Sequence, residues 1–254
     1  TLSAKWSPGV DARKIQFATV ITPDVSPQRK KVFLETIKAA VNQKNGNYAP
    51  RMRTMSSAAE MMLNTNRFWE LAVWELQGEP QTWAAQLEER YRAQPVFALV
   101  SGLGAGQWMP VHDFCERQKV ACWFPSVDAP PESATKDFYS LYFSNGVALE
   151  AEVLARHLGT AKPARLIQLH RGDVAGRAGA AQLQALLASS AQKLPVITRS
   201  VNGTDAASLT RALADVGQND AVMMWWPEGD APALEAVAVP KGAVYLSARM
   251  AGAE

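Results

Sequence analysis

The stretch Val96-Phe97-Ala98-Leu99-Val100-Ser101-Gly102-Leu103-Gly104-Ala105-Gly106 decides the class of fold. It begins with an apolar run, which is typical of a parallel strand covered on both faces. Small residues then form a turn, and Val111, Phe114 and Gln118 follow at helical spacing. A strand, a tight turn and a helix in this order are the repeating unit of an α/β protein.

The same alternation continues on both sides of this unit. Short apolar runs predict further strands at residues 15–21, 68–76, 121–124, 165–169, 196–201, 221–226 and 243–246. Spacing and capping residues predict helices between these strands. Three are bounded by a residue range, about 107–119, 176–192 and 231–237, and one runs from Pro27 to a stop at Asn45-Gly46. The others are indicated by the stripe Trp83, Leu87 and Tyr91, by a start after Asn145-Gly146, and by a cap at Thr204 or Asp205.

A break in the alternation divides the chain into two lobes. Residues 1–130 form the first predicted lobe, with an irregular Met-rich insertion at 47–67. Residues 131–146 are predicted to link the lobes and cross between them, and 147–254 form the second lobe. The predicted fold class is α/β, with two doubly wound parallel-sheet lobes and a ligand cleft between them.

Two stretches around the break support this division. Residues 126–136 combine Pro130 and Pro131 with small and charged residues, which is typical of a linker. The partly alternating run 138–143 predicts a strand that crosses between the lobes.

Composition excludes several classes of function. There are 26 Lys and Arg against 24 Asp and Glu in 254 residues, so the charge does not indicate a nucleic-acid binder. The longest basic run, Arg29-Lys30-Lys31, is expected to be the solvated first turn of a helix. No apolar stretch approaches the roughly 20 residues of a membrane span, so no membrane insertion is expected. The three histidines are scattered and no CxxC motif occurs, so no metal site is predicted.

The topology predicts where a ligand would bind. In open parallel sheets, ligands bind outside the carboxyl ends of the strands. Two lobes joined by crossing segments would form a cleft there, and hinge closure would bury the ligand. The loops expected at this cleft are residues 22–26, 101–107, 125–130, 171–176 and 225–230.

In combination, several of these stretches resemble type I periplasmic binding proteins, in particular the branched-chain amino-acid receptors of ABC importers. The resemblance is carried by residues 96–102, 112–116, 122–125, 141–151, 166–170 and 221–228, which match successive strands, helices and loops of that family. It runs from about residue 68 to residue 250 and includes the first strand and helix, whereas 47–67 match poorly.

The resemblance implies a non-catalytic receptor. Such a receptor captures a small polar solute, an amino acid or a related compound, and delivers it to a membrane permease or another membrane-associated complex. The resemblance also implies a periplasmic location with the signal peptide removed. The start Thr1–Trp6 is polar and lacks Met, as expected for a processed chain or for a trimmed one. Family members usually continue further and return to the first lobe, so a truncated or partial chain is expected.

The first candidate site is the loop at Ser101 and Gly102. At the matching positions of the family, a hydroxyl and backbone N–H groups hold a ligand carboxylate, because a helix N-terminus presents unpaired donors. The alternative is a glycine-rich turn without a ligand. A dinucleotide fingerprint is incomplete, because Gln107 stands where its third glycine is required.

The second candidate is Ser126, Val127 and Asp128. The resemblance assigns a hydroxyl and backbone amides here to the same carboxylate, but Asp128 replaces a small hydroxyl residue. An ionised Asp repels a carboxylate, so this position favours a cationic or polyhydroxylated ligand. The alternative is an Asp that turns a linker beside Pro130.

The second lobe offers three more candidates. Trp226 is predicted to form an aromatic wall, and Glu228 to meet an ammonium group or hydroxyls. The alternative has Trp225 and Trp226 in the core, one on each side of the sheet. Asp173 could reach the ligand from its loop, although a plain turn is the simpler interpretation.

The two cysteines have two interpretations. Cys115 and Cys122 are seven residues apart, on a predicted helix and the following strand. In an exported protein they would form a disulfide, the interpretation we favour; otherwise they would pack as buried thiols.

No enzyme and no cofactor are predicted. The sequence has no nucleotide fingerprint, no GxSxG elbow and no placed acid–base pair. The alternative to a receptor is a scaffold or sensor subunit that retains the fold and docks to a protein partner. The Met-rich insertion and Asp128 favour that alternative over a standard importer receptor.

Overall fold

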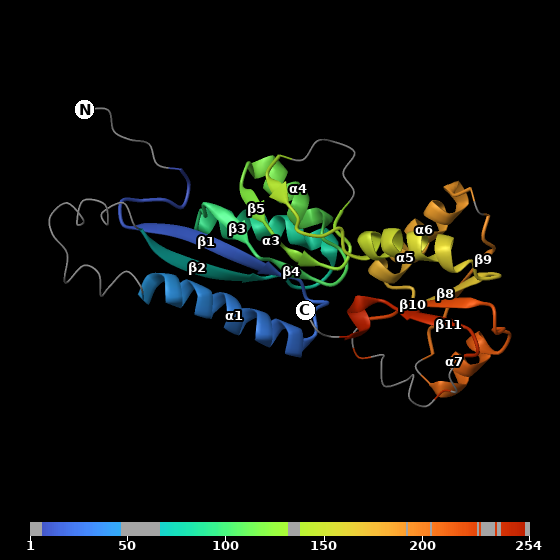
Figure 1. Cartoon of the computed structure of the whole chain (residues 1–254). Helices are drawn as coiled ribbons and strands as arrows, with labels where there is room; N and C mark the ends of the chain where they lie inside the picture. The colour runs from blue at the N-terminus through green and yellow to red at the C-terminus, as the bar shows by residue number, and fades with distance from the viewer. Residues whose placement is uncertain are drawn as a thin grey trace. The chain divides into compact units, whose positions relative to one another are not determined.

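The computed structural model describes residues 7–46, 67–131, 138–191, 193–203, 205–227, 229, 237 and 240–251. The chain divides into two compact units, Thr1–Phe143 and Ser144–Glu254. Each unit is an α/β structure with its own parallel sheet (Figure 1).

The first unit contains a seven-stranded sheet. Its order is β6-β4-β1-β3-β5-β7, β2 also pairs with β1, and every strand pairing is parallel. The strands are β1 (Lys14–Ile21), β2 (Phe68–Glu75), β3 (Ala98–Val100), β4 (Leu103–Gly104), β5 (Ala121–Trp123), β6 (Ser126–Val127) and β7 (Ser140–Leu141). The helices are α1 (Pro27–Gly46), α3 (Pro80–Ala93) and α4 (Met109–Gln118).

The core of the first unit lies between the sheet and the pair α3 and α4. Trp83 and Leu87 of α3, one turn apart, and Phe114 of α4 are buried against the sheet. The Phe114 ring meets the Trp74 ring of β2 edge to face, with 6.4 Å between the centroids. Helix α1 lies on the other side of the sheet and has no buried residue (Figure 1).

The second unit contains a four-stranded parallel sheet of order β11-β10-β8-β9. Its strands are β8 (Leu166–His170), β9 (Val196–Ser200), β10 (Ala221–Trp225) and β11 (Ala243–Leu246). Its helices are α5 (Val147–Ala161), α6 (Val174–Ser189), α7 (Ala206–Leu213) and the 3-10 helix η2 (Ala248–Ala251). All of β10 is buried, as expected for a central strand covered on both faces.

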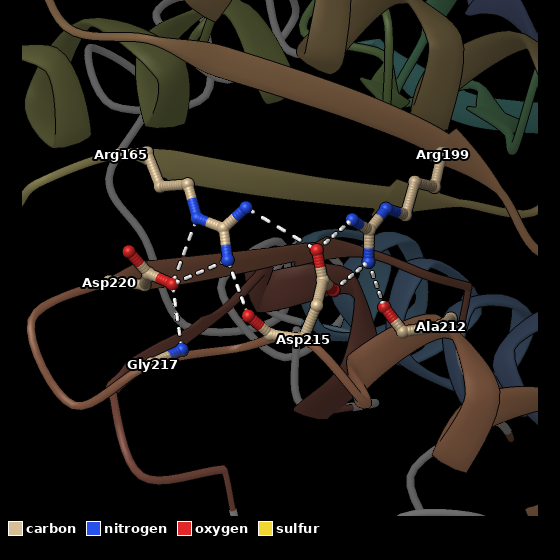
Figure 2. A network of polar contacts seen from close by, with 6 residues as sticks. All are labelled: Arg165, Arg199, Ala212, Asp215, Gly217 and Asp220. Atoms are coloured by element: carbon tan, nitrogen blue, oxygen red, sulfur yellow. Dashed lines mark hydrogen bonds and ion pairs between the residues drawn. The ribbon is translucent and has the colours of Figure 1, made fainter.

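A polar network connects Arg165, the residue before β8, with β9 and the segment after α7 (Figure 2). Arg199 donates to both carboxylate oxygens of Asp215, each at 2.8 Å. Arg165 donates to Asp220 at 2.9 Å, and the backbone N–H of Gly217 donates to the same oxygen at 2.7 Å. The hydrogen bond from Arg199 is the main reason why the pKa of Asp215 is well below its usual range.

The α/β class and the parallel sheets predicted from the sequence are confirmed. Three local predictions are wrong. The turn at 101–106 contains strand β4, the supposed linker begins with strand β6, and the run 138–143 supplies only the short edge strand β7. Helix α1 ends at Gly46, within the predicted stop at Asn45-Gly46. The predicted helix at 231–237 and nearly all of the Met-rich insertion lie outside the described residues.

Candidate functional site

Two of the predicted loops meet at the carboxyl edge of the first sheet. Strand β4 pairs with β6, in the register Leu103 with Ser126 and Gly104 with Val127. The backbone N–H of Ser126 donates to the carbonyl of Gly102 at 2.7 Å. Ser101, between β3 and β4, and Ser126, the first residue of β6, are therefore held at the same edge of one sheet.

Ser101 has an uncommon backbone conformation. Its φ is +48°, a left-handed value that non-glycine residues rarely adopt. Two hydrogen bonds hold it there: its N–H donates to the Trp123 carbonyl at 2.8 Å, and its carbonyl accepts from Thr19 Oγ1 at 3.1 Å. The backbone of Ser101 is fixed by its neighbours, and its side chain is half-buried.

Gly102 is required by close packing. A Cβ atom there would lie 2.5 Å from the ring of Trp108, the residue that precedes α4. Trp108 is only 4% exposed and also covers Gly104. The small residues of this loop therefore make room for an indole ring, in addition to forming a turn.

Asp128 has a cationic partner that the sequence did not indicate. Arg29, in the first turn of α1, places Nη1 3.1 Å from Asp128 Oδ1 and Nη2 3.3 Å from Ser126 Oγ. The prediction that the run Arg29-Lys30-Lys31 is solvated is therefore wrong for Arg29, and Lys30 forms an ion pair with Glu75. The repulsion expected between Asp128 and a carboxylate ligand is offset by Arg29.

Val127 contributes a different part of the loop. Its side chain belongs to the hydrophobic core of the first unit and is 9% exposed. Only its backbone remains for a ligand.

Asp173 lies in a hydrogen-bonded cluster at the carboxyl edge of the second sheet. It is the N-cap of α6, where Oδ2 accepts from the Gly176 N–H at 3.2 Å. The same oxygen accepts from Nη2 of Arg249, a side chain that is only 6% exposed, at 2.8 Å. At the end of β8, burial lowers the pKa of His170, whose Nδ1 accepts from the Gly172 N–H at 2.9 Å.

Trp225, the last residue of β10, and Trp226, the next residue, are both buried, on opposite sides of the sheet. Trp225 packs against Gly179 of α6 and donates from Nε1 to Gln168 Oε1 at 2.8 Å. Trp226 packs among Leu209 and Met224 in the cluster that faces α7, and Arg171 lies over its ring with 3.9 Å from Cζ to the centroid. Within the described part of the chain, Trp226 Nε1 is buried without a hydrogen-bond partner. A contact between Trp226 and a ligand stays a prediction, and Glu228 lies outside the described residues.

The structure joins Cys115 and Cys122 in a disulfide, with 6.1 Å between their Cα atoms. This bond ties α4 to β5, the strand that pairs with β3. Both cysteines are buried in the core of the first unit.

Neither a metal cluster nor a membrane-spanning helix is found in the described ranges. No group of three or more His, Cys, Asp or Glu side chains is placed to hold a metal ion there. None of the helices described is long and apolar enough to cross a membrane. His112 instead contacts Tyr142 Oη through Nδ1 at 2.9 Å.

The fold with these carboxyl-edge loops defines the class: the chain has the fold of type I periplasmic binding proteins. Three solved structures illustrate the similarity. One is described as a possible leucine/isoleucine/valine-binding protein from Rhodopirellula baltica SH 1, with 17% identity and a TM-score of 0.62. The others are a type 1 periplasmic binding protein from Bordetella pertussis Tohama I, with 18% identity and a TM-score of 0.52, and an ABC-type branched-chain amino acid transporter from Rhodopseudomonas palustris CGA009, with 14% identity and a TM-score of 0.51.

The match covers most of this chain but little more than half of the others. It covers 89%, 84% and 87% of this chain, against 59%, 55% and 58% of those three chains, in the same order. No family model and no curated protein matches the sequence. The fold is therefore shown by structure alone.

The residue that sequence reasoning missed is Arg29. A signal for it was present, because α1 follows β1 directly and its first turn must therefore begin at the carboxyl edge of the sheet. A basic residue in that turn lies beside the loops in which ligands bind.

Proposed function

We propose that this chain is the ligand-binding part of an extracytoplasmic solute receptor, without catalytic activity. In this proposal it captures a small polar solute, such as an amino acid or a related compound, for an ABC-type membrane permease in the periplasm. On the first unit, the ligand would contact Ser101, Gly102, Ser126 and the backbone of Val127.

One observation carries the proposal. The pairing of β4 with β6 brings the hydroxyl-bearing residues Ser101 and Ser126 to one edge of a parallel sheet. Ligands of open α/β sheets bind at this edge. The left-handed conformation of Ser101 adds support, because strained backbone is concentrated at binding sites.

A thermal-shift screen tests the proposal. The panel contains amino acids, their amides, polyols and aromatic acids. A solute at 100 times its Kd stabilises the folded state by about 2.7 kcal/mol, which raises the Tm of a protein of this size by about 5–10 °C. We expect at least one member to reach this shift, and Ser126→Ala to reduce it while leaving the Tm without ligand nearly unchanged.

The scaffold alternative is favoured by one feature, an apolar surface at the open edge of the first sheet. Phe138, Phe143 and Leu141 are 83%, 82% and 52% exposed beside the edge strand β7. Exposed apolar patches often mark protein interaction sites. No thermal shift with any member of the panel would favour this alternative over the receptor.

A further inference from the structure

We propose that Asn145 is a site of spontaneous covalent modification: its side chain cyclises onto the backbone nitrogen of Gly146, loses ammonia, and is hydrolysed to aspartate or isoaspartate. Asn145 is the second residue of the unit Ser144–Glu254 and lies two residues before helix α5. The inference does not depend on the proposed solute-binding function.

The reaction needs water as its co-reactant and no oxidant or reductant. The Gly146 nitrogen attacks Cγ of Asn145, and its proton leaves with the side-chain amide as ammonia. A bond from Cγ to the backbone nitrogen thus replaces the bond from Cγ to Nδ2 and closes a cyclic imide. Water then opens the imide at either carbonyl, which gives aspartate or isoaspartate. Glycine after asparagine favours closure, because it has no Cβ and its backbone rotates freely.

The sequence contains three pairs of this kind: Asn45-Gly46, Asn145-Gly146 and Asn202-Gly203. Glycine follows the asparagine in each of them, so the steric advantage within the dipeptide is the same. All three pairs lie in the described part of the chain. Their surroundings in the fold therefore decide which of them reacts.

The Asn45 pair is protected by hydrogen bonds. Both ends of the Asn45 amide bind the backbone of Trp69: Oδ1 accepts from its N–H at 2.9 Å, and Nδ2 donates to its carbonyl at 2.8 Å. Gly46 is the last residue of α1, so its backbone is held in a helical conformation. Cyclisation would require the side chain to release Trp69 and Gly46 to leave the helix, and both changes cost free energy.

The Asn202 pair is exposed but restrained. Asn202 Oδ1 accepts a hydrogen bond from Ser200 Oγ at 3.1 Å. The backbone of Gly203 is closely packed, since a Cβ atom there would overlap the side chain of Ser208. The Gly203 nitrogen can therefore approach Cγ of Asn202 only if these contacts shift.

The Asn145 side chain has no such restraint. It is exposed, and no hydrogen bond joins its amide to another described residue. Gly146 is the N-cap of α5 and has a φ of +53°, which glycine adopts without strain. Its N–H donates to Ser144 Oγ at 3.0 Å, so a hydroxyl oxygen lies beside the proton that must leave. Of the three pairs, this one combines a free side-chain amide with a glycine outside a helix.

The modification changes charge and chain length close to the boundary between the two units. Either product has a carboxylate in place of a neutral amide, next to the first turn of α5, where negative charge is favourable. The isoaspartate product also adds a carbon atom to the main chain, shortly after the first unit ends at Phe143.

Ageing of the purified protein tests the inference, with the other two pairs as internal controls. The folded chain is incubated at mildly alkaline pH, and peptide mapping by mass spectrometry follows the conversion of each pair over time. Enzymatic methylation identifies the isoaspartate product. We expect Asn145 to react fastest, and at least about 10-fold faster than Asn45, because Asn45 must break two hydrogen bonds. In urea, where the fold is lost, the three rates should become similar.

Two variants check the assignment on the intact protein. Asn145→Gln should remove most of the acidic species that isoelectric focusing detects in the aged wild type, because glutamine would have to close a larger ring. Asn202→Gln changes the other exposed pair and should leave most of that species in place. Both side chains are exposed, so both variants should fold like the wild type.

The outcomes separate this inference from the proposed function. Conversion of Asn45 or Asn202 at least as fast as that of Asn145 in the folded protein would overturn it, as would an absence of conversion at Asn145. An equal preference for Asn145 in urea would also overturn it, because the fold would then not be the cause. So would an undiminished acidic species in Asn145→Gln. None of these results bears on solute binding, which is measured on freshly purified protein.

Discussion

At the scale of single residues, close contacts explain positions that composition cannot. Gly102 looks like a flexible loop glycine in the sequence, but its role is to leave space for the Trp108 ring. Arg29 belongs to a basic run that is expected to be solvated in the first turn of a helix, but it forms an ion pair with Asp128. Asp128 is 99 residues from Arg29 in the chain, and no local pattern predicts such a contact.

Gly102→Ala should destabilise the first unit. The added Cβ would lie 2.5 Å from the Trp108 ring, so the indole or the loop must shift. Overpacking of this kind costs about 1–3 kcal/mol. Urea denaturation should show this loss, while Gly159→Ala in α5, where no atom lies within 4 Å of the new Cβ, should stabilise the protein by up to about 1 kcal/mol. Equal effects of the two substitutions would contradict the packing role.

Asp215 should make stability depend on pH. Its hydrogen bond from Arg199 lowers its folded pKa below the unfolded value of about 3.9. The carboxylate therefore stabilises the fold above about pH 4, and this contribution is lost as pH falls through the folded pKa.

Asp215→Asn should accordingly lower the free energy of unfolding at pH 7. The difference from the wild type should shrink as the pH is lowered below about 4. The exposed Asp113→Asn serves as the control, with little change at any pH. If the difference in unfolding free energy between the wild type and Asp215→Asn stays constant from pH 7 to pH 2, the ion pair does not cause the pH dependence.

At the scale of elements, helix α4 organises the first unit around the candidate site. The disulfide of Cys115 with Cys122 ties it to β5. Glu116, the next residue on α4, accepts hydrogen bonds from the backbone of Phe138 and Tyr139 and from Ser140 Oγ. These contacts fix strand β7, whose partner among the described strands is β5.

Removal of the disulfide should cost stability without changing the fold. The seven-residue separation corresponds to about 2.5 kcal/mol of loop-closure free energy. The double variant Cys115→Ala/Cys122→Ala should lose about that much in urea denaturation under oxidising conditions. Dithiothreitol should leave the urea midpoint of the double variant unchanged and lower that of the wild type. A wild-type midpoint that does not change with dithiothreitol, even after full unfolding and refolding in its presence, would contradict the disulfide.

Glu116→Gln should loosen β7 selectively. The amide keeps one acceptor oxygen in place of two, and it loses the charge that strengthens the hydrogen bonds from Phe138 and Tyr139. Hydrogen exchange followed by mass spectrometry should show faster exchange for residues 138–142 and unchanged exchange in β1. Unchanged protection of 138–142 would mean that Glu116 is not their anchor.

At the scale of the whole molecule, hydrophobic periodicity predicted the α/β fold class but not the short strands at the edge of the first sheet. Long elements such as β1 and α5 were predicted within a few residues, because their apolar spacing repeats over many positions. The two-residue strands β4 and β6 were missed, because a strand of that length has no period and forms only through its neighbour. The candidate site depends on this pairing, so the sequence suggested Ser101 and Ser126 as candidates but did not predict that β4 and β6 pair.

The most direct test of the proposed receptor is a two-dimensional amide NMR titration of the wild-type protein. The titrant is the solute that gives the largest thermal shift. The account predicts that the amide signals of Ser101, Gly102, Ser126 and Val127 shift together and saturate at one Kd. Saturable shifts confined to other regions, or none at these four residues, would contradict the assignment of this loop pair as the ligand-binding site.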